Sequence, residues 1–234
     1  MQTHLRHTAC AQCPVRCRCV AAGLPPTELG RFDNLIEERY RIKRGRHLFR
    51  QGDSFQALYA VKLGVFKTTL CERDGREQVT GFRMYGEILG LDGIVHQHHA
   101  GNAIALEDAV VCKLPYLPVA ALAGEIQALR HRLLEMMSDE IVRDHRLIML
   151  LGSMNASERL AVFLMNLLER QHARGLSTKE LILRMTRQEI ASYLGIQLET
   201  VSRIFSRFSQ RGLIQVNRRH IRVIDAHQLM RLAS

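Results

Sequence analysis

Four of the six cysteines stand close together near the start of the 234-residue chain. They are Cys10, Cys13, Cys17 and Cys19. A short loop that returns several thiolates to one point is what a zinc ion or an iron–sulfur cluster requires. The neighbouring Arg16 and Arg18 favour the thiolate form and partly offset the negative charge of a cysteine-ligated centre. The spacing alone does not distinguish zinc from an iron–sulfur cluster.

The other two cysteines, Cys71 and Cys112, are isolated in apolar, strand-like segments. That pattern by itself predicts two buried core cysteines. No apolar run approaches the roughly 18 residues of a membrane span, and the polar, basic start lacks the apolar core of a signal peptide. We therefore expect a cytoplasmic protein without a membrane partner, whose cysteines are thiols or metal ligands.

The run from Thr186 to Phe208 has the spacing of a helix-turn-helix. Thr186 and Glu189 match a capping box, and Gly195 suits the left-handed backbone of the turn. The apolar residues of the second helix can be buried together, which leaves three polar side chains pointing outward. These are Glu199, Ser202 and Arg203, at positions where a recognition helix meets base edges. An ordinary pair of helices is the alternative interpretation.

The surrounding sequence favours a DNA-binding module. Residues 213–224 alternate apolar and polar side chains around a turn, which predicts a hairpin or wing. Residues 155–234 hold thirteen Lys and Arg against six Asp and Glu, so they carry seven of the ten net positive charges. Such a module suits the phosphate backbone of double-stranded DNA. We find no nucleophile–base pair and no glycine loop that could cradle a phosphate, so an enzyme is not expected.

Two further segments lie between the cysteines and this module. Residues 31–117 contain short strands separated by glycine turns, which predicts an all-β barrel or roll, either a sensory domain or a scaffold. A helical stretch then runs from about Pro118 to Leu151. Six of its residues are separated by 3, 4, 3, 4 and 3 positions, the seam of a coiled-coil dimer. They are Leu134, Met137, Ile141, Asp144, Ile148 and Leu151.

Asp144 interrupts this otherwise apolar seam. In a symmetric dimer it would face its own copy, and two carboxylates at close range in a low dielectric repel each other. One interpretation is a built-in brake on dimerisation that a signal elsewhere must overcome. The other is that Asp144 tilts to solvent or pairs with Arg143 or His145.

The order of β-roll, long dimer helix and winged helix-turn-helix resembles the CRP/FNR family of bacterial transcription regulators over nearly the whole chain. The cysteines are most similar to those of its FNR branch, the oxygen-responsive fumarate and nitrate reduction regulators. The resemblance implies a [4Fe–4S] cluster on Cys10, Cys13, Cys19 and Cys112, with Cys17 left as an extra thiol that could compete as a ligand. It also implies an α+β fold in four parts: a cysteine segment (1–30), a β-roll (31–117), a dimerisation helix (118–152) and a winged helix-turn-helix (153–234).

The resemblance further implies a mechanism. Glu199, Ser202 and Arg203 match the base-reading positions for a palindrome close to TTGAT-N4-ATCAA. Asp144 matches the aspartate that opposes dimer formation when the cluster is absent. Oxygen would convert the cluster to [2Fe–2S] and then to apoprotein, and the dimer would dissociate from promoters of anaerobic-metabolism genes. RNA polymerase would contact the loop of residues 71–76, where Arg76 replaces a commonly acidic residue.

A protein of this architecture could also respond to a ligand other than an iron–sulfur cluster. Gly86 and Glu87 are typical of cyclic-nucleotide sensors, but residues 98–102 contain no arginine for the cyclic phosphate, so no cyclic nucleotide is expected. A structural zinc on the same thiols is one alternative signal. A heme is another, with His96, His98 or His99 as its axial ligand.

Overall fold

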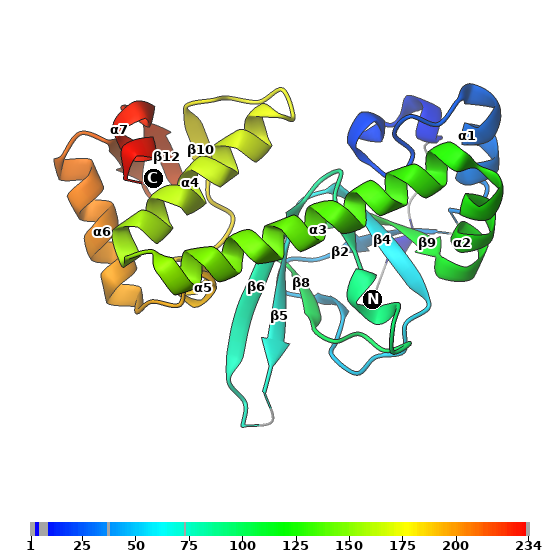
Figure 1. Cartoon of the computed structure of the whole chain (residues 1–234), viewed down its shortest axis with the longest axis horizontal. Helices are drawn as coiled ribbons and strands as arrows, with labels where there is room; N and C mark the ends of the chain where they lie inside the picture. The colour runs from blue at the N-terminus through cyan, green and yellow to red at the C-terminus, as the bar shows by residue number, and fades with distance from the viewer. Residues whose placement is uncertain (1–2, 5–8, 37, 73, 233–234) are drawn as a thin grey trace. The chain divides into compact units, whose positions relative to one another are not determined.

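Residues 3–4, 9–36, 38–72 and 74–232 are described by the computed structural model (Figure 1). Its contacts divide the chain into two units, Met1–Val142 and Arg143–Ser234. The α+β class is confirmed, with a β-roll, a long helix and a winged helix-turn-helix in that order. The four-part division of the chain stays a prediction. None of the described helices is both long and apolar enough to cross a membrane.

The first unit is built on two antiparallel sheets. Their orders are β1-β2-β9-β4-β7 and β3-β8-β5-β6. The strands are β1 (Thr3–His4), β2 (Glu38–Ile42), β3 (His47–Phe49), β4 (Ala57–Leu63), β5 (Val65–Cys71), β6 (Glu77–Met84), β7 (Ile88–Leu89), β8 (Asn102–Ala105) and β9 (Ala109–Pro115). Strand β9 pairs with both β2 and β4, so it is central and carries an almost continuous run of buried residues.

The N-terminal part of this unit lies over the first sheet and forms turns and one short helix. It contains η1 (Cys10–Gln12), η2 (Arg16–Arg18) and α1 (Pro26–Asp33), and a further 3-10 turn, η3 (Leu91–Gly93), follows β7. Apolar side chains of residues 10–24, of α1, of β4 and of β9 belong to one core cluster. Phe32, Leu58 and Leu114 are among its fully buried members. A separate cluster around Phe66 and Val111 fills the space between the sheets.

The helical stretch predicted from Pro118 to Leu151 is two helices, which corrects the expectation of one. They are α2 (Tyr116–Glu125) and α3 (Gln127–Ser153). At Ile126 the backbone is extended, with φ −99° and ψ 103°, and the side chain is 2% exposed. The change in direction allows apolar residues of both helices, including Val119 and Leu129, to be buried in the same core cluster. Burial thus outweighs the helical propensity of a continuous segment.

The second unit is a winged helix-turn-helix. Its elements are α4 (Ala156–His172), β10 (Glu180–Ile182), α5 (Arg187–Leu194), α6 (Leu198–Gln210), β11 (Ile214–Asn217), β12 (His220–Val223) and α7 (Ala226–Arg231). The predicted wing is the β11–β12 hairpin, and β10 adds a third strand in the order β10-β12-β11. Helix α4 begins with a capping box between Asn155 and Glu158.

Candidate nucleic-acid interface and cysteine cavity

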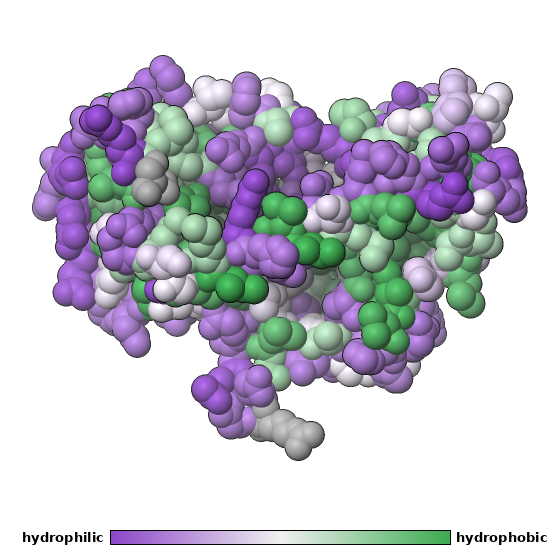
Figure 2. Space-filling view, in the orientation of Figure 1, coloured by the Kyte–Doolittle hydropathy of each residue, from purple (hydrophilic) through white to green (hydrophobic). Residues whose placement is uncertain are grey.

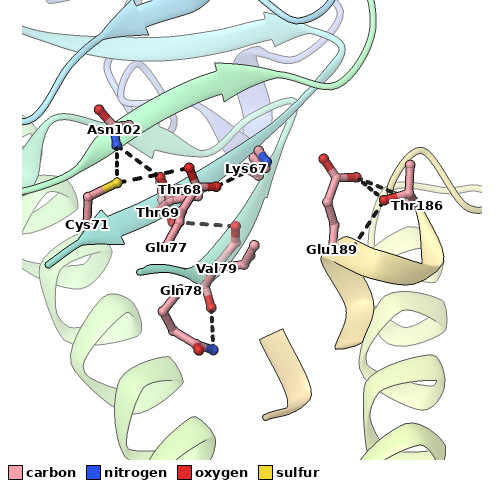
Figure 3. A network of polar contacts seen from close by, with 11 residues as sticks. Lys67, Thr68, Thr69, Cys71, Glu77, Gln78, Val79, Asn102, Thr186 and Glu189 are labelled. Carbon is pink, nitrogen blue, oxygen red and sulfur yellow. Dashed lines mark hydrogen bonds and ion pairs between the residues drawn. The ribbon is translucent and has the colours of Figure 1, made fainter. Parts of the chain in front are cut away.

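The start and end of α5 are fixed by the two local signals that the sequence contains. The Thr186 amide donates to Glu189 Oε2 over 2.7 Å, and the Glu189 amide donates to Thr186 Oγ1 over 3.2 Å (Figure 3). Gly195 closes the helix with φ +62°. A Cβ at this position would lie 3.2 Å from Leu151 Cδ2, so both backbone conformation and space favour glycine. The predicted capping box and turn are confirmed.

Arg159 of α4 holds the ends of two other helices. Its Nη1 donates to Leu194 O over 2.9 Å at the end of α5. Its Nη2 donates to Leu151 O over 2.8 Å and its Nε to Met154 O over 2.9 Å, both at the end of α3. Carbonyls in the last turn of a helix lack intrahelical partners. One half-buried guanidinium therefore satisfies three of them and fixes the base of the helix-turn-helix.

The recognition helix α6 buries one face and exposes the other. Val201, Ile204, Phe205 and Phe208 are buried. The expected base-reading residues Glu199, Ser202 and Arg203 are all exposed. In the free protein Ser202 Oγ donates to Leu198 O over 3.1 Å, and Arg203 Nη2 donates to Thr200 Oγ1 over 3.2 Å. Both side chains can exchange these local contacts for base edges without disturbing the core.

Arg187 lines a cavity beside this helix. Its guanidinium lies 3.2 Å from the centroid of the Phe205 ring, and burial lowers its pKa to about 10, so it remains a cation at neutral pH. Its Nη1 has no hydrogen-bond partner in the described part of the chain. The cavity measures about 410 Å³ and is also lined by Ser202, Ser206, Ser209, Gln210 and Val216. Arg187 was not predicted from the sequence, because the pattern gives only its position directly after the capping residue Thr186.

The second candidate site is a cavity of about 20 Å³ under the N-terminal loop of residues 10–19, the cysteine loop. Its lining includes all four expected cluster ligands: Cys10, Cys13, Cys19 and Cys112. The remaining lining residues are mostly apolar, with three cations among them: Arg16, Arg39 and Lys62. Cys17 is exposed and is not part of the lining. The fold thus brings together the three loop thiols and the strand thiol that the sequence resemblance selected.

Three of the cavity thiols have a raised pKa, which favours their neutral form. Burial raises the pKa of Cys19 from an ordinary 9.0 to about 11. Burial also raises the pKa of Cys10, where the Asp33 carboxylate adds to the effect. At Cys112 burial raises the pKa, while the nearby Arg39 guanidinium opposes the rise. A metal that binds here must displace these protons, so its affinity depends on pH.

One of the residues that line the cavity is a buried arginine, Arg39. It is opposite Cys112 in the β2–β9 register, is 4% exposed, and has Nη2 3.6 Å from Asp33 Oδ1. Its Nε has no hydrogen-bond partner among the residues that the structure describes. A buried positive charge with a spare N–H donor suits an anionic, sulfur-rich group, so the residues present fit a cysteine-ligated cluster. No signal in the sequence would have found it, because the alternation along β2 puts Arg39 on the same face as the exposed Arg41 and opposite Ile42.

No three His, Cys, Asp or Glu side chains in the described residues lie close enough to share a single metal ion. The four thiols nevertheless line one cavity.

Cys71 is not the core residue that its sequence context predicted. It is half-buried at the end of β5, where its Sγ lies 3.4 Å from Asn102 Nδ2 (Figure 3). The expectation of a buried core cysteine was wrong because β5 ends here, at an exposed hairpin.

The proposed dimer seam is largely uncovered in this single chain. Hydrophobic side chains are visible along α3 in Figure 2, with polar ones between them. Leu134, Met137, Ile141 and Ile148 are 58%, 41%, 56% and 67% exposed. Asp144 is also exposed, whereas Leu151 is half-buried near Gly195. The apolar exposure is what a dimer interface would cover, and the role of each residue there stays a prediction.

Comparison with known proteins agrees with this architecture. A cyclic nucleotide-binding domain model matches residues 39–124, and a Crp-like helix-turn-helix domain model matches residues 158–232. The chain is 42% identical to the transcriptional regulatory protein btr of Bordetella pertussis, with 95% of this chain and 92% of that protein covered. It is 39% identical to the fumarate and nitrate reduction regulatory protein of Salmonella typhi, over 96% of this chain and 90% of that protein.

A solved structure shows the same fold. FixK2 of Bradyrhizobium japonicum has a TM-score of 0.77 and 25% identity, and the match covers 84% of this chain and 96% of that one. The relatives and the folds are DNA-binding regulators and not enzymes. The chain therefore belongs to the CRP/FNR family of transcription regulators.

Proposed function

We propose that this regulator responds to oxygen through a [4Fe–4S] cluster held by Cys10, Cys13, Cys19 and Cys112. In the absence of oxygen the loaded protein dimerises through α3 and binds a palindrome close to TTGAT-N4-ATCAA. It then regulates genes of anaerobic metabolism. The proposal is supported by relatives whose names include an anaerobic regulatory protein of Haemophilus influenzae, 40% identical over 95% of this chain.

The proposal is carried by one observation, namely which of the cysteines line the cavity. Three cysteines of one loop and one cysteine of the central strand line a single cavity, whereas Cys17 lies outside it. A set of structural thiols without a common ligand has no reason to meet in this way. The buried Arg39 supplies a permanent positive charge beside them, which favours the thiolate form that iron requires.

The chain's own residues account for the response. When bound, the cluster supplies an oxygen-sensitive group that ties the loop to β9. The loop cysteines and Cys112 would hold it, the apolar lining would limit the access of water, and Arg39 would offset its charge. The Asp144 carboxylates would oppose dimerisation, so the seam would close only when the helix is placed favourably. Without that placement, the repulsion between these carboxylates would keep the subunits apart.

DNA recognition follows from the exposed face of α6. Arg203 can donate two hydrogen bonds to guanine, Glu199 can accept from cytosine, and Ser202 can contact either base type. A two-fold dimer presents this face to each half of a palindrome. RNA polymerase is the proposed further partner, at the loop that contains the exposed residues 72 and 74–76, where Arg76 Nε donates to Asp74 Oδ2 over 2.7 Å.

A cyclic nucleotide is not part of the proposal. The Glu87 carboxylate already accepts the Met84 amide, over 3.0 Å. His99 is buried with its ring stacked on Phe49 at 3.6 Å and its Nδ1 3.5 Å from Asp92 Oδ1. A Cβ added to Gly86 would lie 2.9 Å from Arg18 Cβ, so the cysteine loop packs against the glycine that such ligands usually approach.

The test is an anaerobic purification followed by an absorption spectrum before and after air is admitted, with iron and sulfide assayed on the same sample. A brown protein with about four irons per chain that bleaches in air is expected. Cys112→Ser should lose the iron, whereas Cys17→Ser, the matched control, should keep it. A colourless protein with zinc, a heme spectrum, or equal loss of iron in both variants would refute the proposal.

A further inference from the structure

Arg132 of α3 is hydrogen-bonded to the backbone of the cysteine loop. Its Nη2 donates to Arg18 O over 2.9 Å, and its Nε donates to Cys19 O over 3.2 Å. Its Nη1 donates to Glu135 over 3.0 Å on the helix surface. The dark blue loop and the green helix accordingly meet in Figure 1. A single side chain of the dimerisation helix thus holds the peptide group of a residue that lines the cavity.

The walls of the cavity differ in stiffness. Cys112 lies in β9, which is hydrogen-bonded to strands on both of its edges. The loop is held mainly by short-range bonds, such as Cys13 N to Cys10 O and Cys19 N to Arg16 O. It is attached at its start by the Cys10 amide, which donates to Asp33 Oδ1 over 3.1 Å, and at its end by Arg132.

The thiols that line the cavity suit the group proposed above, but the volume of the cavity in this structure is too small to hold it. A volume of about 20 Å³ accommodates little more than one water molecule, and a four-iron, four-sulfur cluster is larger. One wall must therefore move when the cluster binds. Because β9 is held on both edges, the loop is the wall that yields. Any displacement near Cys19 acts on the Arg132 guanidinium.

Helix α3 converts that displacement into a change at the seam. Leu129 and Met136, three residues before and four after Arg132, are buried against the roll, so this face of the helix points inward. One further turn along, Glu140 is ion-paired with the buried Arg83 of β6. The seam residues Met137 and Ile141 are exposed instead. A helix is stiff, so movement at one face moves the other.

We infer that Arg132 is a positioning residue that couples the placement of the cysteine loop to the placement of the dimer helix. This inference rests on the proposed cluster and adds the residue through which its presence reaches the seam. The hydrogen bonds of Arg132 to the loop go to backbone carbonyls. Arg132 is therefore expected to affect the difference between the dimer dissociation constants of loaded and apo protein. It is not expected to change both constants by the same factor.

The experiment compares dimer dissociation constants of loaded and apo protein by sedimentation, in an Asp144→Ala background in which both states associate. Arg132→Gln should reduce the ratio of the apo constant to the loaded constant about tenfold, since two hydrogen bonds from a charged donor are lost. Arg132→Lys keeps the charge but not both bonds and should give an intermediate ratio. Two controls should leave the ratio unchanged: Glu135→Gln, which removes the other partner, and Arg46→Gln, which removes an exposed charge.

Hydrogen exchange of residues 133–142 is a second readout on the same samples. Cluster loading should alter their protection in the parent and not in Arg132→Gln. An unchanged ratio with unchanged exchange differences, in variants that retain iron, would overturn the coupling role and leave the proposed cluster intact. If the parent itself contains no iron, the proposed function fails and the inference falls with it.

Discussion

The cysteines of the apoprotein should react with alkylating reagents in an order set by the cavity. Burial raises the pKa of Cys19 from 9.0 to about 11, so at pH 8 its thiolate fraction is about a hundredfold lower than that of an ordinary thiol. A more basic thiolate is also more nucleophilic, by roughly eightfold over this range. Ionisation and nucleophilicity together therefore slow Cys19 by about tenfold relative to an ordinary thiol, and restricted access slows it further.

The assay is a time course with iodoacetamide at pH 8, stopped with acid and analysed by peptide mass spectrometry. Cys17, which is exposed and outside the cavity, should be modified first. Cys10 and Cys19 should follow at least about tenfold more slowly, Cys112 should also be slower than Cys17, and the rates of all three should rise with pH beyond 9. Unfolding in urea should equalise all rates. Modification of Cys19 and Cys17 at rates within twofold of each other in the folded protein would refute the cavity argument.

Three further predictions follow from residues outside the cavity. Asp144→Ala should yield a dimer that binds DNA in air, because the opposing carboxylates are gone; a variant that still sediments as a monomer contradicts the brake. Arg203→Ala should cost about 1–3 kcal/mol on the palindrome and little on scrambled DNA, as measured by fluorescence anisotropy, and equal losses on both would exclude base reading. Thr186→Ala should lower the free energy of unfolding by about 1 kcal/mol, with Thr178→Ala, at an exposed loop position, as a neutral control in thermal melts.

Local signals in the sequence predicted much of the second unit. The capping box at Thr186, the left-handed turn at Gly195 and the alternation in residues 213–224 each depend on neighbours within a few positions. Strand β10 was not predicted, because a three-residue strand has no usable periodicity and is stabilised by pairing with β12, about 40 residues away along the chain. Contacts of that kind are invisible to a local pattern.

The candidate cysteine site was likewise predicted from the sequence only in part. The spacing of Cys10, Cys13 and Cys19 identified the loop, and the resemblance added Cys112. Neither could show that Arg39 is buried beside them, since that depends on which face of β2 turns inward. The bend at Ile126 was also missed, because helical periodicity continues through a residue whose backbone is extended only to complete the packing of the roll.

The wide separation of the cavity thiols along the chain sets an order of events during synthesis. Cys19 leaves the ribosome 93 residues before Cys112, the difference between their positions in the sequence. At about 5–20 residues per second this interval is roughly 5–20 s. During that time the early thiols have no strand to meet, and β9 must pair with β2 and β4 before the fourth thiol is in place. Assembly of the proposed centre would therefore be a late step of maturation, and a slowly folding roll would leave its three loop cysteines open to competing oxidants or metals.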